Sequence, residues 1–421
     1  MNENDSERIA GILCQKGAKV SPSLEESNLV IVNTCAVRKK SEDKLFSFLG
    51  RLSLLKQKKN IKIGVAGCVA QLYRSHLLEK KPFVDFVIGP DNYNELPALL
   101  ADKAAEKIIA TSWKNECQEF SPAQVLRKSK YSAYVTIMEG CNNFCAYCIV
   151  PFTRGREKFR PMSEIIREIK YLAENGYKEV HLLGQNVNSY YDPESSKTFP
   201  QLLREVNKIE GIEWIRFLSS HPKNFAPAIT EAMKDSDKVC HQLHLPVQSG
   251  SSSILKKMKR GYTREEYLEK IFYLRKLMPD ISLSTDVIVG FPGETEEDFQ
   301  QTLDLLKEVR FTNIFSFHYS PRPFTAAAKM KDNVPLREKR RRLIELQTLQ
   351  KNIQLESNKS LIGKAIKVLC LGKSKKNPQL YSGRNESYQV VNFKSQKNVI
   401  GRFVHVLIAD CGPYSLIGKL T

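Results

Sequence analysis

The sequence has 421 residues and a formal net charge of +19, with 42% hydrophobic and 26% charged residues. These proportions are those of an ordinary globular protein of two or three domains, and no apolar run reaches the roughly 18 residues that a membrane span needs. The polar, acidic N-terminus resembles neither a signal peptide nor a transit peptide, so we expect a cytoplasmic protein whose clustered cysteines bind metals rather than form disulfides.

Residues 1–115 alternate short apolar runs with helical patterns, which predicts an α/β domain with a parallel sheet. Asp5 or Ser6 is the expected N-cap of the first helix. Cys35 and Cys68 follow two of the expected strands, and ligands gather beyond the carboxyl ends of parallel strands. They are candidates for a second metal centre; the alternative is that they are small core residues. Helices are expected at 6–13 and 40–55, and strands at 29–33, 61–67 and 83–89.

Residues 116–357 repeat a strand–helix unit about six times, after a polar segment at 111–132 that contains Cys117 and that we interpret as a linker. Polar or glycine-rich residues follow each strand, so we predict an open, partial (β/α)6 barrel with its ligand-binding face at those strand ends. A long helix at 335–361 closes this domain. Strands are expected at 134–138, 179–184, 214–218, 241–245, 281–289 and 313–319, and helices at 163–175, 199–209, 264–277 and 296–309.

Three cysteines, Cys141, Cys145 and Cys148, follow the first of these strands in the pattern C-x3-C-x2-C. No histidine or fourth cysteine lies nearby to complete the four ligands of a structural zinc site. Three thiolates instead suit a 4Fe–4S cluster that keeps one iron open to bind a small molecule. The alternative is three buried or disulfide-bonded cysteines.

Residues 358–421 change to a period of two, with short strands expected at 368–370, 389–391 and 404–408. This pattern predicts a small antiparallel β-barrel of the OB-like kind. Residues 359–421 hold 11 Lys/Arg against 2 Asp/Glu, and residues 331–421 hold 18 against 6. Such a concentration of positive charge favours a nucleic-acid partner, and a solvated surface is the alternative.

Several motifs together resemble the radical S-adenosylmethionine (radical SAM) methylthiotransferases, and within them the tRNA enzymes, over nearly the whole chain. The three cysteines match the signature of radical SAM enzymes, and the C-terminal segment resembles a TRAM domain. The motifs that carry the narrower resemblance are Asn33–Arg38, Gly64–Gln71, Pro151–Arg156, Leu183–Asn188, His244–Gly250, Met258–Arg264, Ile288–Thr295, Tyr319–Pro323, Gly383–Arg384 and Ser415–Lys419.

The resemblance implies a reaction on tRNA, with two 4Fe–4S clusters and S-adenosylmethionine as cofactors. One electron from a flavodoxin- or ferredoxin-like donor would cleave S-adenosylmethionine at the first cluster, and the resulting radical would activate C2 of N6-isopentenyladenosine at position 37, in the anticodon loop. A methylated sulfur from the auxiliary cluster would then be transferred to that carbon. The cofactors supply this chemistry, and the protein holds them close together, most simply as a monomer.

The resemblance also assigns residues. Cys141, Cys145 and Cys148 would ligate the radical cluster, and Cys35 and Cys68 the auxiliary cluster. Gly290 to Gly293 would let the backbone approach the adenine or ribose of S-adenosylmethionine. Strand-end candidates for binding S-adenosylmethionine are Gln185, Arg216, Ser219, Gln248 and Asp286, and candidates for tRNA phosphates or the methionine carboxylate, or plain surface residues, are Arg154, Arg156 and Arg160.

The sequence departs from the family at its N-terminus, where the auxiliary cluster normally receives a third cysteine. Met1 to Glu7 matches the family's residues immediately after that cysteine, which would fall two positions before Met1. Cys14, in or after the first helix, is a poor substitute. We expect that the start has been assigned to an internal methionine, and that the 421-residue form cleaves S-adenosylmethionine but transfers sulfur poorly.

Three other functions stay open on the sequence alone. One is a methylthiotransferase that acts on N6-threonylcarbamoyladenosine of tRNA. Another is a methylthiotransferase for a ribosomal protein, which the basic C-terminal segment disfavours. The third, of a different class, is a non-catalytic RNA-binding protein with a structural metal, for which reduction in the presence of S-adenosylmethionine would yield no 5′-deoxyadenosine.

Overall fold

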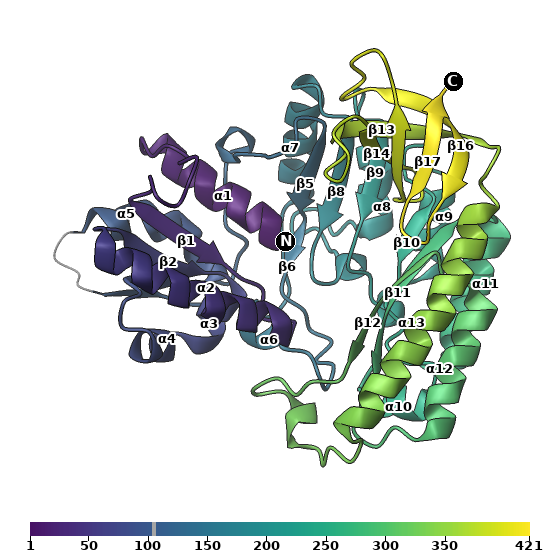
Figure 1. Ribbon diagram of the computed structural model, residues 1–421, viewed down its shortest axis with the longest axis horizontal. Coiled ribbons are helices and arrows are strands. Elements are labelled where there is room, and N and C mark those ends of the chain that lie inside the picture. The colour runs from purple at the N-terminus through teal and green to yellow at the C-terminus, as the bar shows by residue number, and fades with distance from the viewer. Residues whose placement is uncertain (103–106) are drawn as a thin grey trace. The chain divides into compact units, whose positions relative to one another are not determined.

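The computed structural model describes residues 1–102 and 107–421, which pack into two compact units (Figure 1). The first unit comprises residues 1–128, 136–168 and 320–328, and the second comprises 129–135, 169–319 and 329–421. Both units are therefore built from segments far apart in sequence. The domain boundaries expected near residues 115 and 357 remain predictions.

The first unit contains a parallel sheet in the order β1-β2-β3-β4, as the alternating pattern predicts. Val30 and Val32 of β1 pack toward α2, whereas Leu29 and Ile31 pack toward α1, so both faces of the sheet are covered. The strands are β1 (Leu29–Asn33), β2 (Lys62–Ala66), β3 (Phe86–Ile88) and β4 (Ile108–Ala110). The helices are α1 (Asn2–Gln15), α2 (Lys39–Lys58), α3 (Cys68–Tyr73), α4 (Ser75–Lys80) and α5 (Leu96–Ala101) (Figure 1).

Two expectations for this unit are wrong. Helix α1 begins at Asn2, so Asp5 and Ser6 lie inside it and neither is its N-cap. The segment at 111–132 is not a free linker, because its residues to 128 pack into the first unit, where the amide of Leu126 donates to the Glu7 carbonyl at 3.1 Å. A short 3-10 helix, Pro122–Gln124, lies against α1 in this segment.

The first unit is completed by the segment that carries the three clustered cysteines. A short antiparallel hairpin, β6 (Met138–Glu139) with β7 (Lys158–Phe159), closes around it, and α6 (Val150–Thr153) lies between them. Helix α7 (Met162–Glu174) comes next, and its residues to Glu168 belong to this unit. The cysteines therefore belong to the same compact unit as the parallel sheet.

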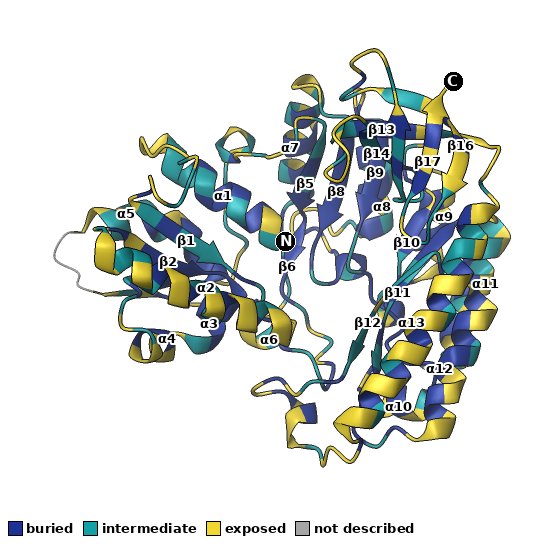
Figure 2. Ribbon diagram, viewed as in Figure 1, coloured by how far each residue is buried: buried dark blue, intermediate teal, exposed yellow. Residues whose placement is uncertain are grey.

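The second unit contains the strands predicted for the partial barrel, arranged as two three-stranded sheets, β5-β8-β9 and β10-β11-β12. A parallel bridge between Ile215 and Val239 continues from β9 toward β10. Strands β8 and β9 are buried along their whole length (Figure 2). The strands are β5 (Ser132–Thr136), β8 (Glu179–Leu183), β9 (Trp214–Phe217), β10 (Gln242–His244), β11 (Ser282–Val289) and β12 (Asn313–His318).

Helices connect these strands and begin at recognisable caps. The hydroxyls of Thr263 and Thr295 accept hydrogen bonds from the amides of Glu266 and Asp298, and both helices carry a complete capping box. The bounds of these two helices agree with the predicted ones. The helices are α8 (Phe199–Asn207), α9 (Pro227–Lys234), α10 (Ser252–Lys257), α11 (Arg264–Leu277), α12 (Glu296–Val309) and α13 (Leu336–Lys359).

The C-terminal segment forms a closed barrel in the order β13-β14-β15-β17-β16, which confirms the predicted small β-barrel. The structure has two strands that the sequence pattern did not indicate, β14 and β17, and β15 pairs with β17 in parallel. Val368, Val391, Phe393 and Leu416 fill the interior. The strands are β13 (Ala365–Lys373), β14 (Tyr381–Asn385), β15 (Val390–Lys394), β16 (Phe403–Cys411) and β17 (Leu416–Leu420).

Candidate functional site

The cysteine loop, residues 141–148, is held closed by backbone contacts. The Cys141 amide donates to the Gly155 carbonyl at 3.2 Å, and the Cys148 amide donates to the Cys145 carbonyl at 2.9 Å. Gly140 precedes the loop with φ of +80°, and a Cβ there would lie 1.9 Å from the carbonyl oxygen of Arg156. Only glycine allows the two sides of the loop to approach so closely.

The three thiols of this loop are available as metal ligands, but they are not close enough together to bind a metal ion as they stand. Within residues 1–102 and 107–421, no group of three or more His, Cys, Asp or Glu side chains is close enough to hold a metal ion. No disulfide joins any of the ten cysteines, all of which lie in those ranges. Burial raises the pKa of Cys141 to about 11, so a metal must displace its proton. The donor set, three thiols on one closed loop, fits an iron–sulfur cluster.

Cys35 and Cys68 are brought together because the segments after β1 and β2 continue side by side. The Thr34 amide donates to the Ala66 carbonyl at 3.2 Å, and the Val69 amide donates to the Thr34 carbonyl at 3.2 Å. Gly67 makes this possible, because a Cβ there would lie 2.2 Å from the side-chain oxygen of Asn33. Burial, reinforced by the nearby Cys68, raises the pKa of Cys35. The two strand-end thiols therefore lie close to each other.

Arg154 connects this site to the cysteine loop. It lies directly after α6, and its Nε lies 3.3 Å from the sulfur of Cys68. One terminal nitrogen forms an ion pair with Asp5 of α1, and the other, Nη1, is buried without a hydrogen-bond partner. Burial lowers the pKa of the Arg154 guanidinium, but Asp5, followed by Cys68, Tyr93 and Glu139, outweighs it and raises that pKa above its ordinary range. The guanidinium is therefore a permanent cation beside a cysteine sulfur.

Further buried ion pairs surround Arg154. Their presence corrects the expectation for the three arginines after the loop, since Arg154 and Arg160 are buried in ion pairs and only Arg156 is exposed. The pairs are Arg8 with Glu139 at 3.3 Å, Lys158 with Asp91 at 2.6 Å, and Arg160 with Glu168 at 2.8 Å.

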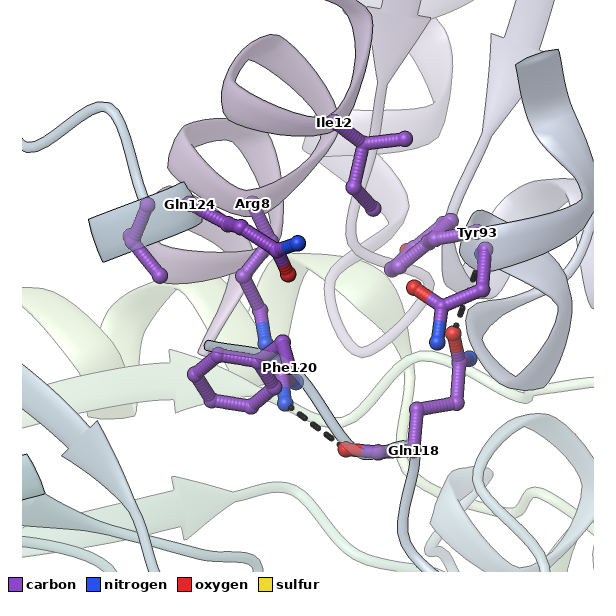
Figure 3. Close-up of a pocket in the computed structure, with 8 residues that line it drawn as sticks. Arg8, Ile12, Tyr93, Gln118, Phe120 and Gln124 are labelled. Carbon is purple, nitrogen blue, oxygen red and sulfur yellow. Dashed lines mark hydrogen bonds between the residues drawn. The ribbon is translucent and has the colours of Figure 1, made fainter. Parts of the chain in front are cut away.

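A small cavity of about 10 Å³ lies beside this network, with room for about one water molecule (Figure 3). The guanidinium of Arg8 points into it, stacks on Phe120 with 3.5 Å to the ring centroid, and donates to the Gln118 carbonyl at 3.3 Å. A cavity of this size holds no organic cofactor. This cavity is therefore too small to be a substrate pocket.

The candidates for binding S-adenosylmethionine all lie in the second unit, within its strands or just after them. Ser219 follows β9 and Gln248 follows β10, and both adopt positive φ, 71° and 74°. Such backbone conformations are strained for residues other than glycine and concentrate at functional sites. The side-chain oxygen of Gln248 is buried without a partner, and Asp286 of β11 lies 3.6 Å from His244. Gln185 follows β8 and is half-buried.

Arg216 has another role than the one expected. Its guanidinium is fully buried and donates to Glu179 at 2.6 Å. It also donates to the backbone carbonyls of Asn385 and Glu386, at 2.8 Å for Asn385, between β14 and β15. Its two terminal nitrogens thus hold the C-terminal barrel on β9, and its Nε ties β9 to β8. The geometry makes Arg216 a structural tie rather than a ligand-binding residue.

The basic run at the start of α13 is partly neutralised. Lys339 is paired with Asp332 at 2.5 Å, and Arg341 and Arg342 contact Glu296 and Glu338. No helix among residues 1–102 and 107–421 is long and apolar enough to cross a membrane.

Sequence reasoning missed the residues that position the two sets of cysteines. Asp5 and Arg154 are 149 positions apart, and no local pattern links them. Arg322 belongs to a quoted motif, but its contacts with the Ala36 carbonyl at 2.6 Å and with Glu42 at 2.8 Å depend on tertiary structure. The first helix has polar residues at nearly every position of its first two turns, and this is the one sequence signal that could have indicated buried polar contacts.

Comparison with known families and proteins agrees with this arrangement. Residues 135–306 match the Radical SAM superfamily, residues 1–89 match the family described as UPF0004, and residues 359–421 match the TRAM domain. A protein of Thermodesulfovibrio yellowstonii named tRNA-2-methylthio-N(6)-dimethylallyladenosine synthase is 47% identical over 421 residues, which cover 100% of this chain and 96% of that protein. A protein of the same name from Syntrophus aciditrophicus is 46% identical, covering 100% and 92%.

Solved structures share the fold at low sequence identity. A structure of the radical S-adenosylmethionine methyltransferase TsrM from Kitasatospora setae, with cobalamin and a [4Fe-4S] cluster bound, superposes with a TM-score of 0.57 at 15% identity, covering 77% of this chain and 70% of that one. A structure of the cobalamin-dependent S-adenosylmethionine radical enzyme OxsB gives 0.52 at 14% identity, covering 72% and 49%. By its full-length relatives, the chain belongs to the radical SAM tRNA methylthiotransferases, in the family of the tRNA-2-methylthio-N(6)-dimethylallyladenosine synthases.

Proposed function

We propose that this protein attaches a methylthio group to C2 of N6-isopentenyladenosine at position 37, in the anticodon loop of tRNA. The observation that carries the proposal is that two cysteine sites belong to one compact unit and are connected through Arg154, which contacts Cys68. One site suits a cluster that activates a small molecule, and the other suits a second cluster. The names of the full-length relatives support the choice of nucleoside.

The cysteines of the chain would hold both clusters. Cys141, Cys145 and Cys148 would ligate a 4Fe–4S cluster with one open iron, and Cys35 and Cys68 would ligate the auxiliary cluster together with a third ligand. When bound, these clusters and S-adenosylmethionine supply one-electron cleavage chemistry and the transferred sulfur. The protein would fix the ligands through the closed cysteine loop, and beside Cys68 it buries the Arg154–Asp5 pair, whose side chains are 3% and 0% exposed.

The strand ends of the second unit would bind S-adenosylmethionine. Gln185, Ser219, Gln248 and Asp286 are the proposed contacts, because the backbone at Ser219 and Gln248 is strained and the Gln248 oxygen is buried without a partner. Arg216 is not among them. The basic C-terminal barrel would bind the tRNA backbone, and a flavodoxin or ferredoxin would supply the electron to a monomer in the cytoplasm.

The test is anaerobic reconstitution with iron and sulfide, and then reaction with S-adenosylmethionine, a reductant and tRNA that carries isopentenyladenosine. Chromatography is expected to show 5′-deoxyadenosine, and mass spectrometry of the digested nucleosides is expected to show the 2-methylthio product in the low yield expected of the 421-residue form. The Cys145→Ala variant should lose both products. The Cys68→Ala variant should still form 5′-deoxyadenosine but no methylthio product.

Two results would contradict the proposal. Methylthiolation of N6-threonylcarbamoyladenosine instead would give the sister activity. Absence of 5′-deoxyadenosine from a reconstituted protein that holds about four irons per radical cluster would leave a metal-containing RNA-binding protein without this catalysis.

A further inference from the structure

Three exposed phenylalanines surround the cysteine loop in the first unit. Phe144 lies within the loop and is 45% exposed, and Phe152 of α6 is 39% exposed. Phe324, in the segment 320–328, is 65% exposed. The rings of Phe152 and Phe324 are 6.0 Å apart between centroids, tilted by 36°. Two aromatic rings that contact each other while both remain in solvent form a surface for a partner rather than a core.

The backbone presents two of these rings at a conformational cost. Phe324 has φ of +65° and Phe144 has φ of +46°, in the left-handed region. Bulky residues are uncommon there, because the left-handed conformation crowds a side chain against its own backbone. Burying a ring could offset such a cost, but these rings are exposed. A strained backbone conformation at a residue whose apolar ring is exposed to solvent indicates that the ring is needed there for function.

The segment that carries Phe324 is fixed at both ends. On one side, the buried Arg322 donates to the Ala36 carbonyl at 2.6 Å and to Glu42 at 2.8 Å. On the other, the Ala327 amide donates to the Ala146 carbonyl, inside the cysteine loop, at 2.7 Å. The ring is therefore held beside the loop before any partner arrives, which lowers the entropic cost of binding.

The chemistry around the rings favours an unpaired nucleobase. The guanidinium of Arg156 lies 5.5 Å from the ring centroid of Phe144, the exposed phenylalanine within the cysteine loop, so a cation adjoins one of the three exposed rings. Aromatic faces flanked by arginine are the usual means of binding single-stranded nucleic acid, because every base has a face that can stack. A base next to a modified nucleotide in an RNA loop is unpaired and lies within reach of such a surface.

We propose that Phe152 and Phe324 form a stacking platform for an unpaired base of the RNA substrate, beside the cysteine loop. The RNA class rests on the proposed function. The platform is uncharged, so it contributes to affinity for loops but not to the salt dependence of binding, which reports phosphate contacts. Replacing a phosphate-binding residue of the C-terminal barrel would instead change the salt dependence of binding.

The experiment measures binding to a fluorescently labelled anticodon stem–loop by anisotropy, with metal-free and with reconstituted protein. The variants are Phe324→Ala, Phe152→Ala, and Phe324→Trp, which keeps a stacking face. The matched control is Phe272→Ala, an equally exposed phenylalanine (50%) on α11 of the second unit. A fully paired duplex serves as the control RNA.

Each alanine variant is expected to bind the stem–loop about 5- to 100-fold more weakly, the range for loss of one base–aromatic stack. Binding to the duplex and the slope of affinity against salt concentration should not change. Phe324→Trp and Phe272→Ala should bind as the unchanged protein does. Circular dichroism spectra of the variants check that each one is folded.

Equal stem–loop binding by the alanine variants and the unchanged protein would overturn the platform. So would a slower reduction by flavodoxin with RNA binding intact, which would make this surface a docking site for the electron donor. Nucleoside analysis tests the proposed function separately from the platform. If the alanine variants lose stem–loop binding but the unchanged protein forms no methylthio product, the proposed activity is wrong and the platform is still supported.

Discussion

Replacing Arg154 by methionine is expected to destabilise the first unit strongly. The ion pair between Arg154 and Asp5 is buried, with side-chain exposures of 3% and 0%. Removing one partner of such a pair leaves an uncompensated charge and costs about 3–5 kcal/mol. The Asp5→Leu variant should lose a comparable amount, because Arg154 would then remain charged beside Cys68 and buried Tyr93. The double variant should recover most of the loss, since apolar residues of similar volume replace a buried pair at little cost.

The two tryptophans of the chain make the assay specific. Trp113 belongs to the first unit and Trp214 to the second, so in a Trp214→Phe background the fluorescence of Trp113 reports unfolding of the first unit alone. Urea titration of the metal-free protein then gives the free energy of unfolding for the four members of a double-mutant cycle. A coupling energy near zero, or a single variant within about 0.5 kcal/mol of the unchanged protein, would refute the reasoning.

The same cycle separates stability from cluster binding. Arg154 also contacts the sulfur of Cys68 at 3.3 Å, and the double variant lacks this contact even when it is folded. We therefore expect the folded double variant to show an altered electron paramagnetic resonance signal after reconstitution. An Arg156→Gln variant, changed at an exposed arginine two residues away, is the control and should keep both stability and signal.

Individual residues support two further predictions. Burial, with Arg260 and Lys223, lowers the pKa of His221 to about 2, so its neutral form stabilises the fold above pH 6.5 and this stabilisation is lost as the pH falls. His221→Gln should remove about 1 kcal/mol of the stability difference between pH 7 and pH 5.5, measured by urea titration monitored through Trp214; an unchanged difference would be evidence against it. Gly140→Ala should leave the loop open and lower iron retention, and wild-type iron content in that variant would contradict the role of Gly140.

The sequence was sufficient for elements that have a strong local signal. Continuous apolar runs identified β1 and β11, and threonine caps fixed the starts of α11 and α12. It was insufficient for β14 and β17, whose five residues each include a glycine and exposed or polar positions. Those strands form because the closed barrel supplies partners on both sides, which no window of sequence contains.

The candidate site shows the same division. Spacing identified the three loop cysteines, and strand-end position identified Cys35 and Cys68. Strand-end position was misleading for Arg216, because alternate residues of a strand point to opposite faces and this one turns to the barrel hairpin. A shift of one residue along the strand therefore decides whether a side chain points to the ligand-binding face or to a neighbouring domain. The sequence alone does not determine which residues point to which face.

Buried polar contacts fix the relative position of the two cysteine sites more strictly than hydrophobic packing could. Three ion pairs, Asp5–Arg154, Arg8–Glu139 and Asp91–Lys158, each join residues 1–128 to residues 136–168 and are almost fully buried. Apolar surfaces can slide past one another at small cost, whereas displaced partners of a buried ion pair become uncompensated charges. The pairs therefore add little net stability, but any shift of residues 136–168 relative to residues 1–128 would leave buried charges unpaired and would be destabilising. We infer that the three pairs keep the distance from the cysteine loop to Cys68 constant.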